Sequence, residues 1–151
     1  MSAAGELLRI WSKRVHRGPM DALETAYLEP GGLRGDASFG RRFRQVTLLQ
    51  KELWEEVEGD LGAPVDPVLR RANLLLRDLD LADSRGKILR IGPCRLHIRG
   101  ETRPCRFMDE QYPGLRAALH PPWRGGAYAE VLDGGEIRRG DPVSWEDEGN
   151  P

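Results

Sequence analysis

Long apolar runs are missing from this sequence of 151 residues. The longest are a few residues, such as "LLL" at 74–76. The opening stretch "MSAAGELLRIWSKRV" also lacks the basic start and continuous apolar segment of a secretory signal. A membrane-spanning helix needs about 20 consecutive apolar residues. We therefore expect a cytoplasmic protein without a membrane partner.

Cysteine and histidine are scarce as well. The two cysteines, Cys94 and Cys105, are too few for the disulfide framework of a small secreted protein. We expect both thiols to be free, with a disulfide between them as the alternative. The histidines His16, His97 and His120 lie far apart and do not form the close pairs of a structural zinc site. We expect His97, on the polar side of its segment, to be solvated or hydrogen-bonded.

An excess of charge of either sign is absent too. Lys and Arg total 23 against 24 Asp and Glu, so the electrostatic footprint of a nucleic-acid-binding protein is missing. Only three of the basic residues are lysine: Lys13, Lys51 and Lys87. Arginine forks suit bidentate recognition of phosphate or carboxylate, although a genomic codon bias would produce the same excess. The length and composition fit one domain over residues 1–151, with "EDEGNP" at 146–151 as a disordered tail.

Short segments with strand character make up most of the chain. In "CRLHIRGE", residues 94–101, apolar and polar residues alternate strictly, which predicts a half-buried antiparallel strand. Glycine, proline and aspartate turns separate this segment from others of the same kind. The others are "LLRIWSKRV", "RFRQVTLL", "ANLLLRDLDL", "KILRI", "AYAEVL", "EIRRG" and "PVSW". Many short strands at this spacing predict a mainly β barrel or sandwich.

Two stretches have a helical pattern instead. Leu49, Leu53 and Val57 are spaced by four residues, which places their side chains on one helix face. A second helix is expected over 114–119, where Pro113 suits the first helical position. We expect both helices to lie on the periphery of the β structure.

Cys105 lies in "GETRPCRFMDEQYPGLRAAL", residues 100–119, where the strand pattern gives way to a helical one. Arg103 and Arg106 are close in sequence, and nearby cations favour the thiolate, which is the nucleophile and the metal ligand. Pro104 restricts the chain just before the thiol. Cys94, on the apolar side of its strand, is expected to be a core residue. Cys105 is therefore the candidate reactive thiol, although arginines are abundant everywhere in this chain.

Four segments, in order, resemble the MOSC domain, named for the carboxy-terminal domain of molybdenum cofactor sulfurases. They are "GLRGDASFGRRFRQVTLL", "LRRANLLLRDLDL", "KILRIGPCRLHIRGETRPC" and "WRGGAYAEVLDGGEIRRGDPV", and the resemblance covers about 13–143. It implies a closed β-barrel of short, mostly antiparallel strands with a few peripheral helices. It also implies binding of a molybdenum-pterin cofactor (molybdopterin), or sulfur carriage, through a cysteine. Cys105 in "RPC" matches that cysteine, and Arg71 and Asn73 in "RRAN" match the family's R-x-N segment.

A pterin cofactor of this kind carries a phosphate and a ring rich in hydrogen-bond donors and acceptors. A pocket for it should offer arginine forks, amide side chains and closely approaching backbone N–H groups. Turn geometry or a solvated surface is the alternative explanation for most of the residues that could do so. The candidates are Arg71, Asn73, Thr102, Arg103, Arg124, Gly125 and Gly126, with Cys105 as the molybdenum ligand.

One motif departs from the family pattern. Many members follow Gly-Asp with a histidine two residues later, whereas this chain has "GDASFG", with Ser38 in that place. An imidazole for proton transfer would therefore be missing or supplied elsewhere. Asp36 remains and is a further candidate for the cofactor site; we expect it either to orient a neighbouring arginine or to cap a turn.

Three functions follow from the resemblance. In the first, Cys105 binds molybdenum and the protein is a small oxidoreductase that reduces N-hydroxylated compounds. Because no flavin or iron–sulfur motif is evident, such an enzyme needs a partner reductase that donates electrons. In the second, Cys105 is a sulfur carrier that receives a persulfide sulfur from a desulfurase and passes it to an acceptor. No pyridoxal phosphate lysine motif is evident, so the chain would not generate that sulfur itself. The third is a cofactor-storage module without turnover.

Overall fold

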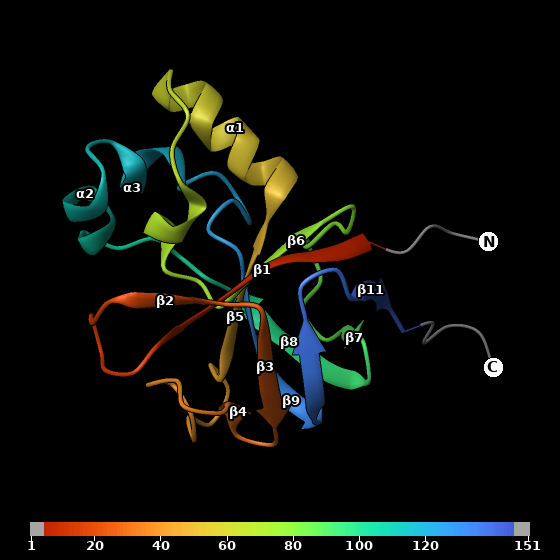
Figure 1. Ribbon diagram of the computed structural model, residues 1–151. Helices are drawn as coiled ribbons and strands as arrows, with labels where there is room; N and C mark the ends of the chain where they lie inside the picture. The colour runs from red at the N-terminus through yellow and green to blue at the C-terminus, as the bar shows by residue number, and fades with distance from the viewer. Residues whose placement is uncertain (1–4, 147–151) are drawn as a thin grey trace.

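Seven strands close into a barrel in the computed structural model, which describes residues 5–146 (Figure 1). Each strand pairs with the next, and the last returns to the first. Around the barrel the order is β1 (Gly5–Lys13), β11 (Pro142–Trp145), β7 (Ile88–Ile91), β8 (Cys94–Glu101), β9 (Ala127–Asp133), β5 (Val46–Gln50) and β6 (Leu74–Arg77). β2 (Met20–Leu23) extends this sheet from β1. The mainly β, closed-barrel prediction is confirmed.

The pairings are antiparallel except one. β5 and β6 are parallel, with Leu48 opposite Leu74. Parallel neighbours need a long crossover, and here it contains α1 (Lys51–Leu61) and the 3₁₀-helix η1 (Pro67–Arg70). The crossover matters for function because η1 brings Arg70 and the following Arg71 to one end of the barrel.

β8 shows why the strand pattern in the sequence was informative. Its residues alternate between buried and half-buried along the whole strand, from Cys94 to Glu101. Leu96 and Ile98 point into a barrel core that also contains Leu7 and Leu89, and all four are fully buried. Burying a leucine or isoleucine side chain contributes roughly 1.5–3 kcal/mol. The alternation of β8 is therefore maintained by the core itself.

Three strands were not predicted from the sequence. These are β2, together with β3 (Thr25–Glu29) and β4 (Gly32–Leu33), and the latter two pair in a small second sheet with β10 (Gly135–Arg138). In β3 only Leu28 is fully buried. Strands with so little apolar alternation give a weak sequence signal.

Four helical segments lie together beside one end of the barrel (Figure 1). Besides α1 and η1 they are α2 (Phe107–Gln111) and α3 (Leu115–Ala118). A second apolar cluster joins them, with Trp54 of α1 and Leu115 of α3 fully buried in it. These helices therefore fix the position of the segment that carries Cys105, between β8 and α2.

The helix predictions were right in type and wrong in their boundaries. Leu49 belongs to β5, and α1 begins only at Lys51, because pairing with β9 and β6 extends the strand into the helical pattern. Pro113 is not the first residue of α3, which begins after Gly114, whose φ of 87° is left-handed. α2 was not predicted, since five residues carry little periodicity.

The disordered tail predicted for residues 146–151 falls mostly on 147–151, which lie outside the described residues. Of the predicted tail, only Glu146 is described: its N–H donates to the Ile88 carbonyl at 2.8 Å, and its carboxylate pairs with Arg95. Among residues 5–146, no helix is both long and apolar enough to cross a membrane.

Candidate functional site

Cys105 opens into a pocket of about 220 Å³ whose other polar lining residues are basic. We call it the thiol pocket. The lining contains no aspartate or glutamate. It comes from the end of β1 and the segment after it, from Arg44 before β5, from the end of η1, and from the β8–α2 connection with the start of α2. The residues are Lys13, His16, Arg17, Arg44, Arg70, Arg71, Arg103, Cys105, Phe107 and Met108. This concentration of positive charge favours an anionic ligand.

The two cysteines lie in opposite environments, and both are free. Cys105 is exposed, and its carbonyl accepts the Met108 N–H at 3.0 Å, which fixes the turn into α2. Cys94 is fully buried in the barrel core, and its Sγ lies 3.4 Å from the Gly135 carbonyl. Burial raises the pKa of Cys94 to about 11. Cys105 is therefore the accessible thiol, and Cys94 is a core residue as its place in the strand pattern predicted.

Arg70 was missed in the sequence and is the most informative residue of the site. Its side chain is buried, with the residue 7% exposed, and it contacts no carboxylate among the described residues. Its Nε donates to the Gly125 carbonyl at 2.9 Å, and a second nitrogen donates to the Thr102 carbonyl at 3.3 Å. A third donates to the Met108 sulfur at 3.3 Å. This buried charge is balanced by neutral acceptors alone.

The same burial lowers the pKa of Arg70 to about 10. The nearby Arg44 lowers it further, while the negative charge of a Cys105 thiolate opposes the change. An unpaired charge inside a protein costs several kcal/mol of solvation free energy. A bound anion in the thiol pocket would offset that cost.

The hydroxyl of Thr102, close to Arg70, is a second polar group without a fully satisfying partner. The N–H of Thr102 donates to the Gly126 carbonyl at 2.8 Å, but its buried hydroxyl has no hydrogen-bond partner among the described residues. Thr102 lines a small void of about 20 Å³ that shares Arg44, Arg70 and Arg71 with the thiol pocket. A buried hydroxyl without a partner is uncommon and needs a ligand or water to satisfy it.

Arg71 reaches the pocket by an unusual backbone conformation. Its φ of 66° ends η1 in the left-handed region, which is uncommon for a residue other than glycine. The guanidinium donates to the Gly18 carbonyl and lies 5.4 Å from the centre of the Phe107 ring. Burial and the neighbouring Arg17 lower the pKa of Arg71. Arg71 therefore lines the thiol pocket.

The structure places Asn73 beneath the pocket, outside its lining. Its Oδ1 accepts the Thr47 N–H at 3.0 Å, while its Nδ2 donates to the Trp11 carbonyl at 3.1 Å and to Asp36 at 3.2 Å. Asn73 is 1% exposed. Its amide therefore ties three chain segments together, two residues after Arg71.

Asp36 belongs to the same buried network. Its carboxylate accepts the N–H groups of Lys13 and Ser38, both at 2.9 Å, in addition to the Asn73 amide. The bond to Ser38 caps the "GDAS" turn, which is the second of the two roles expected for Asp36. By holding the end of β1, Asp36 also sets the place of Lys13, whose pKa is lowered by burial despite the neighbouring carboxylate.

Gly125 and Gly126 contribute through close backbone approach. A Cβ at Gly126, whose φ is 101°, would collide with the Leu48 carbonyl, and a Cβ at Gly125 would collide with the Thr102 carbonyl. Only glycine fits between these strands. The Gly125 carbonyl holds Arg70, so the pair shapes the site from behind.

The remaining predicted arginines differ from each other. Arg103 lines the thiol pocket, with a side chain 62% exposed and 3.7 Å from Glu101. Arg124 lies outside the pocket lining: it pairs with Glu56 and Asp60 of α1, and it donates to the Ala118 carbonyl at 3.0 Å. These contacts give Arg124 a structural role between α1 and α3.

Comparison with known proteins decides the family. The model of the MOSC domain matches residues 13–144. The chain belongs to the MOSC domain family. The solved structure of the YuaD protein from Bacillus subtilis is similar, with a TM-score of 0.82, 19% identity, and coverage of 93% of this chain and 94% of that one.

Two further structures have the same fold. YiiM from Geobacillus stearothermophilus has a TM-score of 0.77 at 17% identity and covers 96% of this chain and 76% of its own. YiiM from Escherichia coli has a TM-score of 0.71 at 14% identity, with 97% and 72% covered. No curated protein matches the sequence.

This MOSC domain offers one thiol in its thiol pocket, beside the thioether of Met108, whose sulfur accepts a hydrogen bond from Arg70. Among residues 5–146, no group of three or more His, Cys, Asp and Glu side chains could hold a metal ion. Cys105 is the pocket's only thiol, and a thiolate suits a high-valent, sulfur-bound metal.

Cys105 of this MOSC domain also faces a second hollow. This outer pocket, of about 550 Å³, is lined by Cys105, Arg17 and Phe107 together with Arg106, Asp109 and Glu110 of the α2 region. The thiol therefore lies between a pocket without carboxylates and one that contains both signs of charge. A group bound to Cys105 would be reachable from the outer pocket.

Proposed function

We propose that this MOSC domain binds a molybdenum-pterin cofactor in the thiol pocket, with the Cys105 thiolate as a ligand of the metal. The observation that carries the proposal is Arg70, a buried guanidinium with no carboxylate among the described residues. Family membership agrees with a role related to the molybdenum cofactor.

The residues present fit such a group. Arg70 and Arg71 supply guanidinium forks for its phosphate, and charge-assisted bonds of this kind are among the strongest hydrogen bonds in proteins. The Thr102 hydroxyl supplies an unused donor and acceptor. When bound, the cofactor supplies two-electron redox chemistry that side chains lack. The chain itself binds the group, orients it and keeps positive charge around it.

For the reaction we propose reduction of an N-hydroxylated compound. The N–O bond breaks, two electrons and two protons are consumed, and the amine and one water are released. The electrons come from a partner reductase. The outer pocket supports this assignment because it gives a small molecule access to the group held on Cys105.

Sulfur carriage is the second candidate, and the exposure of Cys105 favours it. In that reaction the Cys105 thiolate forms a bond to the terminal sulfur of a desulfurase persulfide. The donor's S–S bond breaks, and the donor leaves as a thiolate. This step needs no metal, but it also leaves the buried charge of Arg70 unexplained. Storage of the cofactor without turnover needs only the thiol pocket.

Elemental analysis for molybdenum, combined with intact mass, separates cofactor binding from sulfur carriage. The protein is expressed in a host that makes the cofactor and is purified gently. Stoichiometric molybdenum that is lost in Cys105→Ser and kept in Cys94→Ser supports the cofactor. A mass gain of one sulfur without metal supports the carrier. Loss of metal in Cys94→Ser alone, with Cys105→Ser unaffected, contradicts the choice of thiol.

A further inference from the structure

A separate pocket of about 450 Å³ lies on the outer surface next to the thiol pocket. It is lined by Arg41, Arg42, Phe43, Arg44 and Tyr128, and we call it the arginine pocket. Small-molecule pockets in proteins are roughly 300–1,000 Å³. The first four residues come from the segment before β5, and Tyr128 comes from the neighbouring strand β9. None of these residues except Arg44 lines the thiol pocket.

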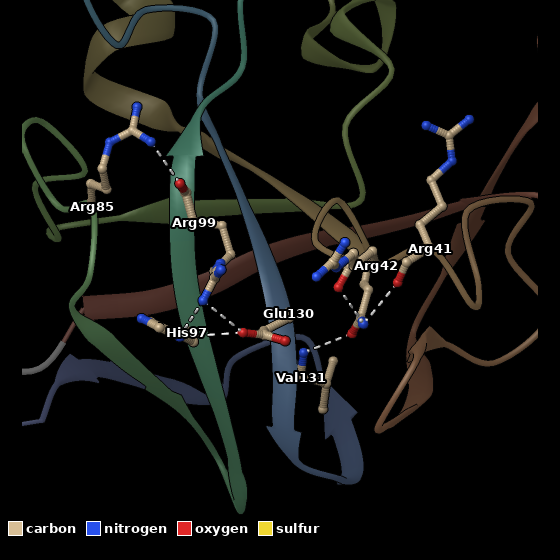
Figure 2. A network of polar contacts seen from close by, with 8 residues as sticks. Arg41, Arg42, Arg85, His97, Arg99, Glu130 and Val131 are labelled. Atoms are coloured by element: carbon tan, nitrogen blue, oxygen red, sulfur yellow. Dashed lines mark hydrogen bonds and ion pairs between the residues drawn. The ribbon is translucent and has the colours of Figure 1, made fainter.

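The arginine segment is held in place by a buried amide (Figure 2). The Gln45 Nε2 donates to the Arg41 carbonyl at 2.9 Å and lies 3.4 Å from the Arg42 carbonyl. The Gln45 Oε1 accepts the Val131 N–H of β9 at 2.9 Å. One side chain thus fastens the backbone of two arginines to the barrel wall. The arginine pocket is therefore built on a fixed support.

The positive charge of this pocket is uncompensated. Within the described part of the chain, Arg41, Arg42 and Arg44 form no ion pair within 4.0 Å. The adjacent Arg99 differs, since its guanidinium is 3.1 Å from the carboxylate of Glu130 and is neutralised by it (Figure 2). Free arginine forks beside a neutralised one favour a ligand that brings its own negative charge.

Aromatic surface accompanies the charge. Phe43 is 38% exposed, with the guanidinium of Arg42 at 5.0 Å and that of Arg99 at 4.1 Å from its ring centre. The Tyr128 ring lies across Gly100, where a Cβ would displace it. Aromatic rings and guanidinium planes are the surfaces on which nucleobases stack.

We propose that the arginine pocket binds a nucleoside phosphate. Arg41 and Arg42 bind the phosphate, and the base lies against Tyr128 and the Phe43 stack. Arg44 lines both the arginine pocket and the thiol pocket, so the two ligands share one cation. The proposal does not depend on the identity of the group at Cys105.

Titration of the purified protein with AMP, followed by calorimetry, tests the proposal. Adenosine and inorganic phosphate serve as separate probes for the base and the charge. We expect saturable AMP binding that is at least about tenfold tighter than either probe, because a charged hydrogen bond and a stacked base each contribute that much. Arg41→Ala and Arg42→Ala should each weaken AMP binding about tenfold or more. Tyr128→Leu should weaken AMP while leaving phosphate unchanged.

Arg139→Ala is the matched control, since Arg139 pairs with Glu24 and donates to the Leu8 carbonyl of β1. It removes the same charge outside every pocket described above and should leave AMP binding unchanged. Equal affinity for AMP and inorganic phosphate overturns the proposal in favour of a plain anion patch. Absence of saturable AMP binding also overturns it. The proposal is also overturned if a poly-glutamate peptide binds the pocket and AMP does not bind, since that outcome indicates a docking surface for an acidic protein.

Discussion

Strand β8 connects two regions that contain the same residue types and have opposite chemistry. At its start, Cys94 is buried and Arg95 pairs with Asp133 and Glu146, with nitrogen–oxygen distances of 2.9 Å to both. Beyond its end, Cys105 is exposed and Arg70 lies buried without a carboxylate among the described residues. A thiol and an arginine are thus structural at one end of the strand and available for chemistry at the other.

The pKa directions express this difference. The two carboxylates raise the pKa of Arg95, and Arg95 in turn lowers the pKa of Glu146. Burial lowers the pKa of Arg70 to about 10. Charges that satisfy one another need nothing further from solution, whereas a charge held only by neutral acceptors retains the capacity to bind an anion. Composition alone does not separate the two kinds of arginine.

Arg70→Met should have the largest effect. It keeps an unbranched apolar stem in place of the arginine stem and removes the guanidinium and its charge from the thiol pocket. We expect cofactor retention to fall by about 3 kcal/mol or more, because the bound phosphate would lose its buried partner. The measurement is molybdenum content after dialysis, with circular dichroism to confirm the fold. Arg95→Met is the control, and a folded Arg70→Met protein that retains all its cofactor removes Arg70 from the site.

Arg71→Ala should have a smaller effect, of about 2 to 3 kcal/mol in retention, since a charged hydrogen bond contributes that much. Arg71 is partly exposed, so solvent replaces some of the lost interaction. Arg124→Ala provides a comparison, because that arginine pairs with α1 outside the pocket lining. It should lower stability and leave retention unchanged. Equal loss of cofactor in both variants means that retention follows stability and not pocket contacts.

The sequence predicted the barrel for identifiable reasons, and it also selected, as the candidate reactive thiol, the cysteine that the structure exposes. β8 alternates strictly because one side of it faces the barrel core, and that pattern is visible in the letters alone. Cys105 was found through its position after the strand and between arginines. The match to the MOSC family rests on several segments in order, and it extends over most of the chain.

The site was only partly predictable because its key property depends on what is far away in sequence. Arg70 contacts Thr102 and Gly125, which lie 32 and 55 residues later. Nothing local distinguishes it from Arg71 beside it. Asn73 matched a family motif, but its contacts to Thr47 and Trp11 place it under the pocket. A motif identifies a segment, and only the fold shows which of its side chains face the ligand.

The buried thiol allows a pH test. Burial raises the pKa of Cys94 from 9.0 to about 11, so the folded state keeps its proton where the unfolded state loses it. This contribution to stability is complete below pH 9 and is lost as the pH rises toward 11. It amounts to about 2 kcal/mol. Urea unfolding at pH 8 and pH 11 should show a steeper loss for the wild type than for Cys94→Ala, whereas Cys105→Ala should resemble the wild type.

Arg95→Ala should have the smallest effect and is the strictest test of the comparison. Its ion pairs lie at the surface, where attraction is weak and is screened by salt. The melting temperature should fall slightly at low ionic strength, and the difference from the wild type should shrink in high salt. Cofactor retention and AMP binding should not change, because Arg95 lines none of the three pockets at the Cys105 end. If this variant keeps its fold but loses either ligand, the two ends of β8 are energetically coupled. The distinction between arginines that are paired with carboxylates and arginines that are not would then fail.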